Sequence, residues 1–398
     1  MKTTKAAVAA TLSATAAVQA AECPHVLIPN YNLPVVAKGW QAQLVLAGLT
    51  KPRSIEFDST GALIVVESGK GITRHTFTDH GSTCLIPDDN TVVVAGAGVS
   101  LSPGSQIPQP TDHADNPKKL NHGLALSRDS NTLYASTVEA VFAWPYDADT
   151  GKVTGANRTL VRGMTNNDLV TRTLLLSKKT EGWLVVSRGS GEDSMLQAES
   201  LSSGLSQIRA FDITSDPRDT PPYDFGSDGR VLGWGLRNSV GVGEHPVTGG
   251  IYAVENSIDG VTRNGRDIHE NNPGEELNFF GYLNESGGTT TAAAAGGNYG
   301  YPRCFAVWDV DEIPEAGGLK IGDQFAIEEH DTLTDEVCAD EYVAPRLTLP
   351  AHYAPLDIKF DGEGRMGFVS FHGSCEFFPL FLFFFVFPSS SLSSTPFN

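Results

Sequence analysis

Basic residues are scarce in this 398-residue sequence. Its 28 Lys and Arg are outnumbered by 47 Asp and Glu, which gives a formal net charge of −19 at pH 7 and a pI near 4.8. Nucleic-acid binding requires a basic face, because Lys and Arg must neutralise the backbone phosphates. We therefore expect no nucleic-acid partner, and any anionic ligand has to meet Arg residues that are gathered locally.

Long hydrophobic runs and long amphipathic helical patterns are also nearly absent. The most apolar stretch near the C-terminus runs only from Phe377 to Pro388 and contains Pro379, whereas a membrane-spanning helix needs about 20 residues. We therefore expect no membrane span. Short apolar alternations bounded by Gly, Asp, Ser and Pro recur along the chain instead, and this pattern is typical of an all-β protein.

The first residues have the features of a secretory signal peptide. Lys2 and Lys5 form a short basic region, and a small apolar run and an A-x-A-like cleavage site follow it. Residues 1–20 are therefore predicted to be removed, and the mature protein to be extracellular. In a secreted chain the sequons at Asn157 and Asn284 predict exposed, glycosylated loops.

Only five cysteines are present, and cysteines of secreted proteins tend to pair. Four of them allow several connectivities. Proximity in the sequence favours Cys23 with Cys84 and Cys304 with Cys338. Cys375 is then left over, at the start of an unusual C-terminal tail.

One sequence pattern recurs five times. Each copy, called a phrase below, reads as a strand, a polar turn and a second strand that ends in Val or Ala plus a polar residue. The copies lie at residues 53–68, 122–137, 172–190, 238–257 and 356–374. Two strands cannot bury a face alone, so units that repeat at this spacing predict the blades of a β-propeller. A β-sandwich also fits the spacing, but it gives no reason for one phrase to repeat so closely.

Aligning the phrases predicts a polar ring at the propeller axis, because the first strand of each blade lines the central channel. The equivalent positions before the first strands are Arg53, His122, Arg172, Asn238 and Leu356. The ends of the second strands add Glu67, Ser136, Arg188, Asn256 and His372. Gathering three Arg and a His at one axis is unfavourable unless an anion offsets their charge, so the ring predicts an anionic ligand.

Several motifs, taken in order, resemble those of the glucose/sorbosone dehydrogenase family, and most closely the secreted fungal pyranose dehydrogenases that depend on pyrroloquinoline quinone (PQQ). The motifs are LNHGLALS (120–127), GLRNSVGVGEHPVTGGIYAVENS (235–257), GEELNFF (274–280), GGNYGYP (296–302), YAPLDIKF and SFHGS (370–374). The likeness runs from about Pro34 to Ser374. It implies a six-bladed β-propeller that binds PQQ and calcium and oxidises a sugar hydroxyl by hydride transfer to the quinone.

The resemblance also implies roles for individual residues. His122 falls at the position of the general base, Arg237 and Asn238 lie against the quinone, and Asn256 lies beside the cofactor. The main-chain carbonyls of Ser257 and Ile258 are expected on calcium, and His372 at a basic cofactor contact. Arg53, Arg172 and Arg188 come from the ring alignment as further cofactor contacts. The expected partners are a sugar substrate and an external electron acceptor, such as a cytochrome domain or protein.

Two other functions fit parts of the pattern. A calcium-dependent lactonase or strictosidine-synthase-like hydrolase also gathers polar residues at a propeller axis, but it usually holds its metal with side chains. A propeller that binds a ligand without catalysis is the third interpretation. The motif GEELN, taken alone, is also typical of a solvated acidic loop.

The tail at residues 375–398 does not continue the family pattern, in which HGS precedes Trp and a basic residue. The tail is Phe- and Ser-rich, lacks Lys and Arg, and is too short in its apolar part to span a membrane. We expect it to be translated non-coding sequence. Residues 21–374 would then form a propeller whose last blade is missing, since five phrases are present where the family fold has six blades.

Overall fold

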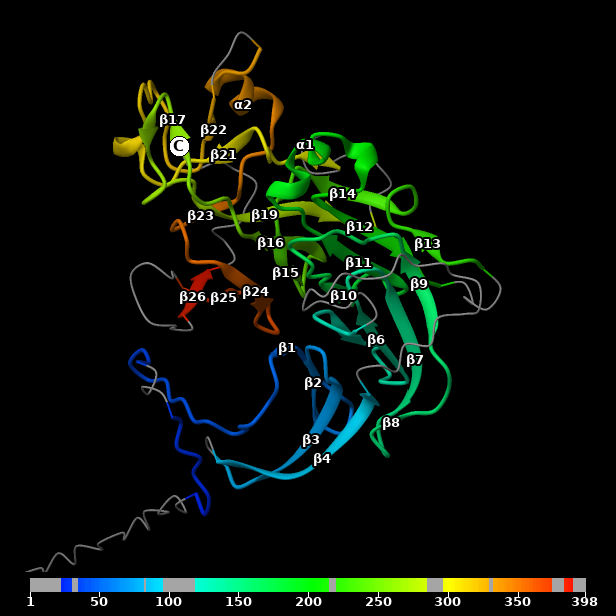
Figure 1. Ribbon diagram of the computed structural model, residues 1–398. Coiled ribbons are helices and arrows are strands. Elements are labelled where there is room, and N and C mark those ends of the chain that lie inside the picture. Colours follow the sequence, from blue (N-terminus) through cyan, green and yellow to red (C-terminus); the bar gives the residue numbers. More distant parts are fainter. Residues whose placement is uncertain are drawn as a thin grey trace, which may run out of the picture. The chain divides into compact units, whose positions relative to one another are not determined.

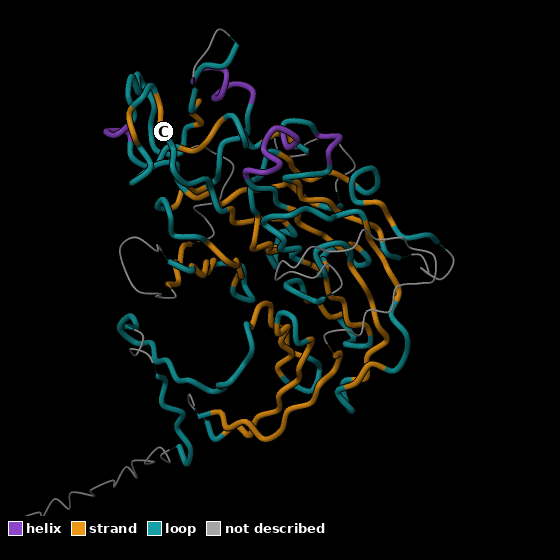
Figure 2. The backbone as a smooth tube through the Cα atoms, viewed as in Figure 1, coloured by secondary structure: helices purple, strands orange, loops and turns teal. Residues whose placement is uncertain are grey.

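The computed structural model describes residues 23–30, 35–81, 84–95, 119–214, 220–284, 296–328, 332–373 and 383–388. Strands dominate these ranges (Figures 1 and 2), which confirms the all-β prediction. The described helical segments are short: η1 (Glu192–Ser194), α1 (Met195–Ala198), η2 (Leu201–Ser203), η3 (Val310–Glu312) and α2 (Asp335–Glu341). None of the helices in these ranges has the length and apolar character needed to cross a bilayer. The predicted signal peptide, Cys375 and most of the tail lie outside the described residues.

The chain forms two compact units, Met1–Ala47 with Phe77–Asp88 and Gly48–Thr76 with Asp89–Asn398. In the first unit, a disulfide joins Cys23 and Cys84, whose Cα atoms lie 5.4 Å apart. This confirms the first predicted cysteine pair.

Five sheets of three or more strands follow one another along the described chain. The first has the order β1 (Pro52–Phe57), β2 (Leu63–Glu67), β3 (Gly71–Asp79), β4 (Leu85–Ala95). The second has the order β13 (Tyr223–Asp224), β9 (Arg158–Arg162), β7 (Val141–Asp147), β6 (Thr132–Ser136), β5 (Leu124–Leu126), with β8 (Lys152–Val153) paired to β7. The third has the order β10 (Leu174–Leu176), β11 (Trp183–Arg188), β12 (Gln207–Asp212), β14 (Arg230–Trp234), β20 (Gly297–Asn298).

The fourth sheet has the order β15 (Ser239–Glu244), β16 (Gly250–Glu255), β19 (Glu275–Tyr282), β23 (Leu347–Leu349), and the last has β24 (Pro355–Phe360), β25 (Met366–Phe371), β26 (Phe383–Pro388). Two small hairpins, β17 (Thr262–Arg263) with β18 (Arg266–Asp267) and β21 (Cys304–Ala306) with β22 (Gln324–Ala326), lie between β16 and β23 in the sequence.

Each of the five predicted phrases folds as an antiparallel strand pair that opens a sheet: β1 with β2, β5 with β6, β10 with β11, β15 with β16, and β24 with β25. The opening strands contact one another in sequence order, β1 with β5, β5 with β10, β10 with β15, and β15 with β24. Successive sheets that meet through their first strands are arranged as the blades of a β-propeller.

Apolar side chains fill the space between each sheet and the next. Ile64 and Ile72 of the first sheet pack in one cluster with Leu133 and Phe142 of the second. Equivalent clusters join the second sheet to the third, the third to the fourth, and the fourth to the last. The second strands are therefore buried on both faces, which explains why β2, β11 and β16 read LIVVE, WLVVSR and GIYAVE rather than alternating apolar and polar residues.

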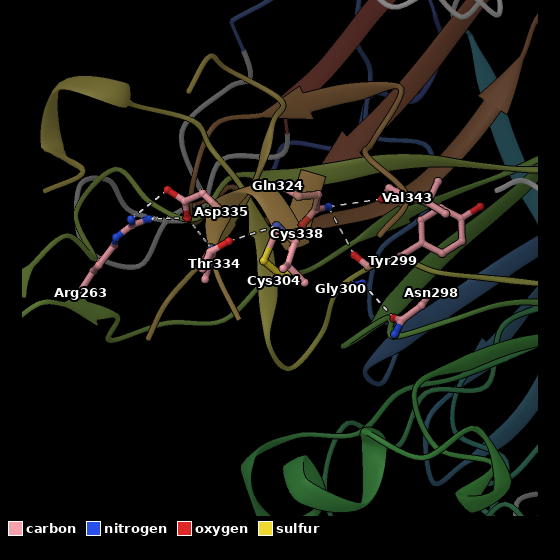
Figure 3. The surroundings of a disulfide bond; sticks show 12 residues. Arg263, Asn298, Tyr299, Gly300, Cys304, Gln324, Thr334, Asp335, Cys338 and Val343 are labelled. Carbon is pink, nitrogen blue, oxygen red and sulfur yellow. Dashed lines mark hydrogen bonds and ion pairs between the residues drawn. A yellow bond between two sulfur atoms is a disulfide. The ribbon is translucent and has the colours of Figure 1, made fainter. Parts of the chain in front are cut away.

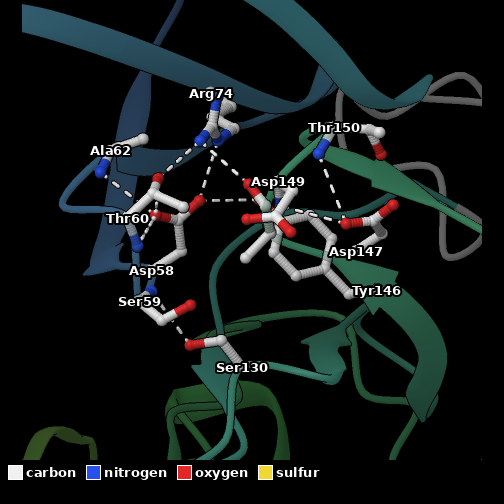
Figure 4. A network of polar contacts seen from close by, with 11 residues as sticks. Asp58, Ser59, Thr60, Ala62, Arg74, Ser130, Tyr146, Asp147, Asp149 and Thr150 are labelled. Carbon is white, nitrogen blue, oxygen red and sulfur yellow. Dashed lines mark hydrogen bonds and ion pairs between the residues drawn. The ribbon is translucent and has the colours of Figure 1, made fainter.

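A buried ion pair of the first sheet is hydrogen-bonded to residues of the second (Figure 4). Asp58, which follows β1, accepts hydrogen bonds from Arg74 Nε of β3 at 2.8 Å and from the Tyr146 hydroxyl of β7 at 2.9 Å. Arg74 also donates to the main-chain oxygen of Ala148 at 3.0 Å. Burial alone would raise the pKa of Asp58, but hydrogen bonds from Thr60, Arg74 and Tyr146 hold it below its usual value.

The last sheet includes part of the unusual tail. Residues Phe383–Pro388 form β26, which pairs antiparallel with β25 from Phe371 opposite Phe383 to Met366 opposite Pro388. The chain thus uses a Phe-rich segment as a third strand. The origin of residues 375–398 as translated non-coding sequence stays a prediction.

The segment between β19 and β23 carries the second disulfide, Cys304 to Cys338, with Cα atoms 5.7 Å apart (Figure 3). It confirms the second predicted pair. In the same region, the fully buried Arg263 of β17 forms a bidentate pair with Asp335 of α2, with both distances 2.9 Å. This pair connects α2 to the β17–β18 hairpin, whose Thr262 and Asp267 line the cavity described next.

Candidate functional site

A cavity of about 600 Å³ opens among loops that flank strands of the fourth and last sheets. Its volume lies in the range of roughly 300–1,000 Å³ that is usual for small-molecule sites. Polar and charged residues dominate its wall. The lining residues are Arg237, Asn256, Ser257, Asp259, Gly260, Thr262, Asp267, His269, Glu275, His352, Ala354, His372 and Gly373.

Arg237 stands at the start of the fourth sheet, after a sharp turn at Gly235. Gly235 has φ +69°, and a Cβ atom there would lie 2.0 Å from Asn298 Oδ1, so the turn requires glycine. The main-chain N–H of Arg237 donates to Glu255 Oε1 at 2.6 Å. Its guanidinium donates to the main-chain oxygens of Ser257 and, at 3.5 Å, Asn256. Asp259 Oδ2 lies 4.0 Å from Arg237 Nη2.

The Asn256–Ser257 segment follows β16 and presents main-chain oxygens to that guanidinium. Asn256 N–H donates to Asn238 O at 3.0 Å, and its side-chain amide donates to Pro355 O at 2.6 Å. Ser257 N–H donates to Glu275 Oε2 at 2.7 Å. With both N–H groups held elsewhere, the two carbonyls already solvate a cation, the guanidinium of Arg237. Such hard oxygen donors suit calcium. The Ile258 side chain packs instead against a neighbouring apolar cluster.

A charged pair that the sequence did not indicate lines the same cavity. His352 Nδ1 lies 2.9 Å from Asp259 Oδ1, and this bond raises the pKa of His352 to about 9. The imidazolium in turn lowers the pKa of Asp259. The two residues are 93 positions apart and belong to no shared motif. The only sequence signal for this pair is that His352 immediately precedes the motif YAPLDIKF.

Of three buried glutamates at the cavity, Glu275 lines it and Glu255 and Glu276 do not. Burial is the main cause that raises the pKa of Glu275 and of Glu276 to about 7 each, and the pKa of Glu255 well above its usual value. Glu255 and Glu276 are directly opposite in the β16–β19 register, and the Asn278 amide donates to both. GEELN is therefore a buried strand and not a solvated loop.

His122 precedes β5 and is not among the cavity-lining residues. Its Nε2 lies 3.2 Å from Thr173 Oγ1, whose own proton goes to Val240 O. His122 Nε2 therefore carries the hydrogen, and the buried Nδ1 has no hydrogen-bond partner among the described residues. Burial, followed by the charge of Arg53, lowers the pKa of His122 to about 4. The imidazole is neutral at pH 7 and able to accept a proton.

Hydrogen bonds connect neighbouring strand starts. Thr171 Oγ1 donates to Asn238 Oδ1 at 3.3 Å, and Ser136 Oγ donates to Arg172 O at 2.8 Å. These bonds connect the segments that carry His122, Arg172 and Asn238. Arg53 on β1 is exposed and makes no hydrogen bond or ion pair to the described residues.

Arg172 and Arg188 are placed differently from expectation. Arg172 is fully buried, and its five N–H groups go to Val138 O, Leu169 O, Thr171 O, Met164 O and Asn166 Oδ1. Arg188 donates to Gly204 O at 3.2 Å and to Thr165 O at 3.0 Å, and its guanidinium lies 5.8 Å from the centre of the Phe225 ring. Neither residue lines the cavity. Both guanidinium groups hold loops of the protein.

The structure thus brings four of the predicted residues together at the cavity, namely Arg237, Asn256, Ser257 and His372. His122, Asn238 and Arg53 lie at neighbouring strand starts outside its lining, and Ile258 directs its side chain into a core cluster. Sequence reasoning missed Asp259, His352 and Glu275 as members of the site.

Comparison with known proteins is consistent with this geometry. A family described as TrAA12-like matches residues 34–379. A pyrroloquinoline quinone-dependent sugar dehydrogenase of Hypocrea jecorina is 46% identical over 349 residues, which cover 87% of this chain and 75% of the relative. A pyrroloquinoline quinone-dependent pyranose dehydrogenase of Coprinopsis cinerea is 35% identical over 88% of this chain and 44% of its own length.

A solved structure shows the same likeness in three dimensions. The calcium structure of a Trichoderma reesei carbohydrate-active enzyme of family AA12 has 44% sequence identity and a TM-score of 0.81, and the match covers 94% of this chain and 86% of the other. The predicted resemblance to fungal PQQ-dependent sugar dehydrogenases is confirmed, and the chain belongs to the TrAA12-like family.

Proposed function

We propose that this protein is an oxidoreductase that uses PQQ and calcium to oxidise a hydroxyl of a pyranose or related sugar. The observation that carries the proposal is the cavity in which the Arg237 guanidinium meets the carbonyls of Asn256 and Ser257. It combines a cation for an anionic cofactor with oxygen donors for a hard metal ion. Membership of a family whose named relatives are PQQ-dependent sugar dehydrogenases supports it.

The residues at the cavity fit a planar tricarboxylate. Arg237 offers a bidentate donor, and His372 and Asn256 line the same wall. Asn238 supports Asn256 through its main-chain oxygen, and Arg53 is an exposed cation near His122. We propose these five residues as the cofactor contacts. Arg172 is not included because its five N–H groups are engaged by the protein itself, and Arg188 is not included because it donates to Gly204 O and Thr165 O and does not line the cavity.

The carbonyl oxygens of Ser257 and Ile258 are the proposed calcium ligands. Arg237 donates to Ser257 O, so its guanidinium has to leave that oxygen when a metal ion binds there. Asp259, 4.0 Å from Arg237 Nη2, is an alternative partner for it. When bound, PQQ supplies the hydride acceptor and calcium supplies Lewis acidity at the quinone oxygen.

His122 is the proposed general base. A neutral imidazole with a free lone pair at Nδ1 can take the proton of a sugar hydroxyl as that carbon loses hydride. Thr173 and Val240 fix the opposite edge of the ring, so the orientation of the lone pair is set by the third and fourth sheets. The electrons leave through an external acceptor.

Two further features extend the proposal. We propose that the fold is the six-bladed propeller implied by the family resemblance, of which five sheets lie in the described residues. We also propose that the protein is secreted and glycosylated, which is supported by two disulfides in its fold.

The test is turnover of purified protein, supplied with PQQ and calcium, on a panel of neutral pyranoses with an artificial electron acceptor. The proposal expects acceptor reduction that requires both PQQ and calcium. Hydrolysis of lactones in the absence of PQQ would favour the calcium-dependent hydrolase instead. Ligand binding with neither activity would favour the non-catalytic propeller.

A further inference from the structure

The motif GEELN places two adjacent glutamates in β19, and the proposed function uses neither of them. Glu275 is 4% exposed and Glu276 is 5% exposed. Consecutive side chains of a strand point to opposite faces of the sheet. Glu275 lines the cavity, whereas Glu276 accepts from the amides of Asn278 at 2.9 Å and Gln324 at 3.4 Å.

The carboxylate of Glu275 bridges two loops of different sheets. Its Oε2 accepts the Ser257 N–H at 2.7 Å, and its Oε1 accepts the Ala354 N–H at 2.9 Å. Ser257 follows β16 of the fourth sheet, and Ala354 immediately precedes β24 of the last sheet. A single buried side chain therefore ties together the two walls of the cavity.

Further bonds extend from this bridge to a third cavity residue. Ala354 O accepts the His372 N–H at 3.0 Å. Ala354 has φ +47°, a left-handed conformation that is unfavourable for a residue with a Cβ and persists only where surrounding contacts hold it. Here Glu275 holds its N–H and His372 occupies its carbonyl.

We propose that Glu275 is a positioning residue that fixes the cavity wall formed by Ser257, Ala354 and His372, and with it the direction of the Ser257 carbonyl. Its carboxylate acts through the main chain and not by contact with the cofactor. The consequence for calcium and PQQ binding rests on the proposed function, whereas the fixing of the wall does not.

Only a carboxylate with the length of glutamate can accept from both the Ser257 N–H and the Ala354 N–H. Glutamine would present one acceptor and one NH₂ group, so one of the two N–H groups would face a donor. Aspartate keeps the charge but is one methylene shorter, and cannot reach both loops without a shift of the main chain. Glu275→Gln and Glu275→Asp therefore separate geometry from charge. Glu276→Gln is the matched control, because it changes an equally buried neighbour outside the cavity.

The first measurement is amide hydrogen exchange in the ligand-free protein, which reports local opening. Glu275→Gln and Glu275→Asp should accelerate exchange in peptides that contain Ser257 and Ala354, while Glu276→Gln should leave these peptides as in the wild type. Unchanged exchange at both positions in Glu275→Gln would overturn the proposal, whatever the ligand-binding results. Thermal unfolding of all three variants verifies that they are folded.

The second measurement is calorimetric titration of calcium in the presence of PQQ. Loss of one bond to a charged group predicts calcium affinity about tenfold weaker in Glu275→Gln, and a similar loss in Glu275→Asp, with less than about a twofold change in Glu276→Gln. Full rescue by Glu275→Asp would show that charge alone matters and would contradict the positioning role. If the wild type binds no PQQ, the proposed function fails, but the exchange data still decide whether Glu275 fixes the wall.

Discussion

The guanidinium of Arg237 donates a hydrogen bond to the main-chain oxygen of Ser257. The proposed function gives these two groups different partners when ligands bind, an anionic cofactor for the guanidinium and calcium for the carbonyl. In the structure these two groups are hydrogen-bonded to each other. In the proposed function Arg237 is therefore both a cofactor contact and a competitor of calcium at one oxygen.

Arg237→Ala should consequently have opposite effects on the two ligands. PQQ binding should weaken at least about tenfold, because a charge-assisted contact is lost. Calcium binding without PQQ should become tighter, because Ser257 O is released. Calorimetry on each ligand separately checks this, with Arg365→Ala, at an exposed ion pair with Glu363, as the control. Equal weakening of both ligands would contradict the exchange of partners.

His122→Ala should abolish turnover and leave PQQ affinity nearly unchanged, because the imidazole acts on the substrate proton. The measurement is steady-state turnover beside PQQ calorimetry. A variant that loses PQQ binding as Arg237→Ala does would show that His122 contacts the cofactor rather than the substrate.

His122 should also make the fold sensitive to acid. Its pKa is about 4 in the folded protein and about 6.5 when unfolded. The unfolded chain thus binds the proton first, and stability falls as pH drops from about 6.5 to 4. His122→Asn should lose less stability than the wild type over this window in denaturant titrations. Identical pH dependence of the two proteins would mean that His122 is not buried as a neutral ring.

The His352–Asp259 pair should have the reverse dependence on pH. The pKa of His352 is raised to about 9, so the stabilisation is fully present below the unfolded value of about 6.5 and is lost as pH rises through 9. His352→Gln should flatten the decline of the melting temperature between pH 7 and 10. His80→Gln, at an exposed position, is the control and should follow the wild type. A wild-type melting temperature that does not decline over this range would show that the His352–Asp259 pair does not stabilise the fold.

Arg74→Ala should destabilise the fold by about 3 kcal/mol, because it leaves the buried Asp58 carboxylate without its cation. Arg365→Ala at the exposed pair with Glu363 should cost less than about 1 kcal/mol. Denaturant unfolding of both variants makes the comparison. Equal losses of unfolding free energy in the two variants would mean that the Arg74–Asp58 pair is not formed in solution.

The strand phrases and both disulfides could be predicted because they depend on local signals. Alternating apolar residues and turn residues define a strand pair, and nearby cysteines in a secreted chain favour one pairing. Arg237, Asn256 and Ser257 were predicted from the resemblance to a known family, and Asn256 also from the alignment of strand ends; all three line the cavity.

The other features of the site and fold depend on contacts between residues that no local sequence pattern indicates. Arg172 looked like a ligand contact, but four acceptors in the loop at residues 164–171, together with Val138 O, take up its five donors. His352 meets Asp259 across 93 positions. GEELN resembled a solvated loop because burial of paired carboxylates is unfavourable unless amides such as Asn278 satisfy them. The tail resembled no strand, yet Phe383–Pro388 pairs with β25.

The most direct test of the central claim is a calorimetric titration of PQQ into the wild-type protein with and without calcium. The account predicts saturable, stoichiometric binding that requires calcium and is accompanied by a rise in the melting temperature. Absence of heat and of any thermal shift with both ligands present would contradict the assignment of the Arg237–Ser257 cavity as the cofactor site.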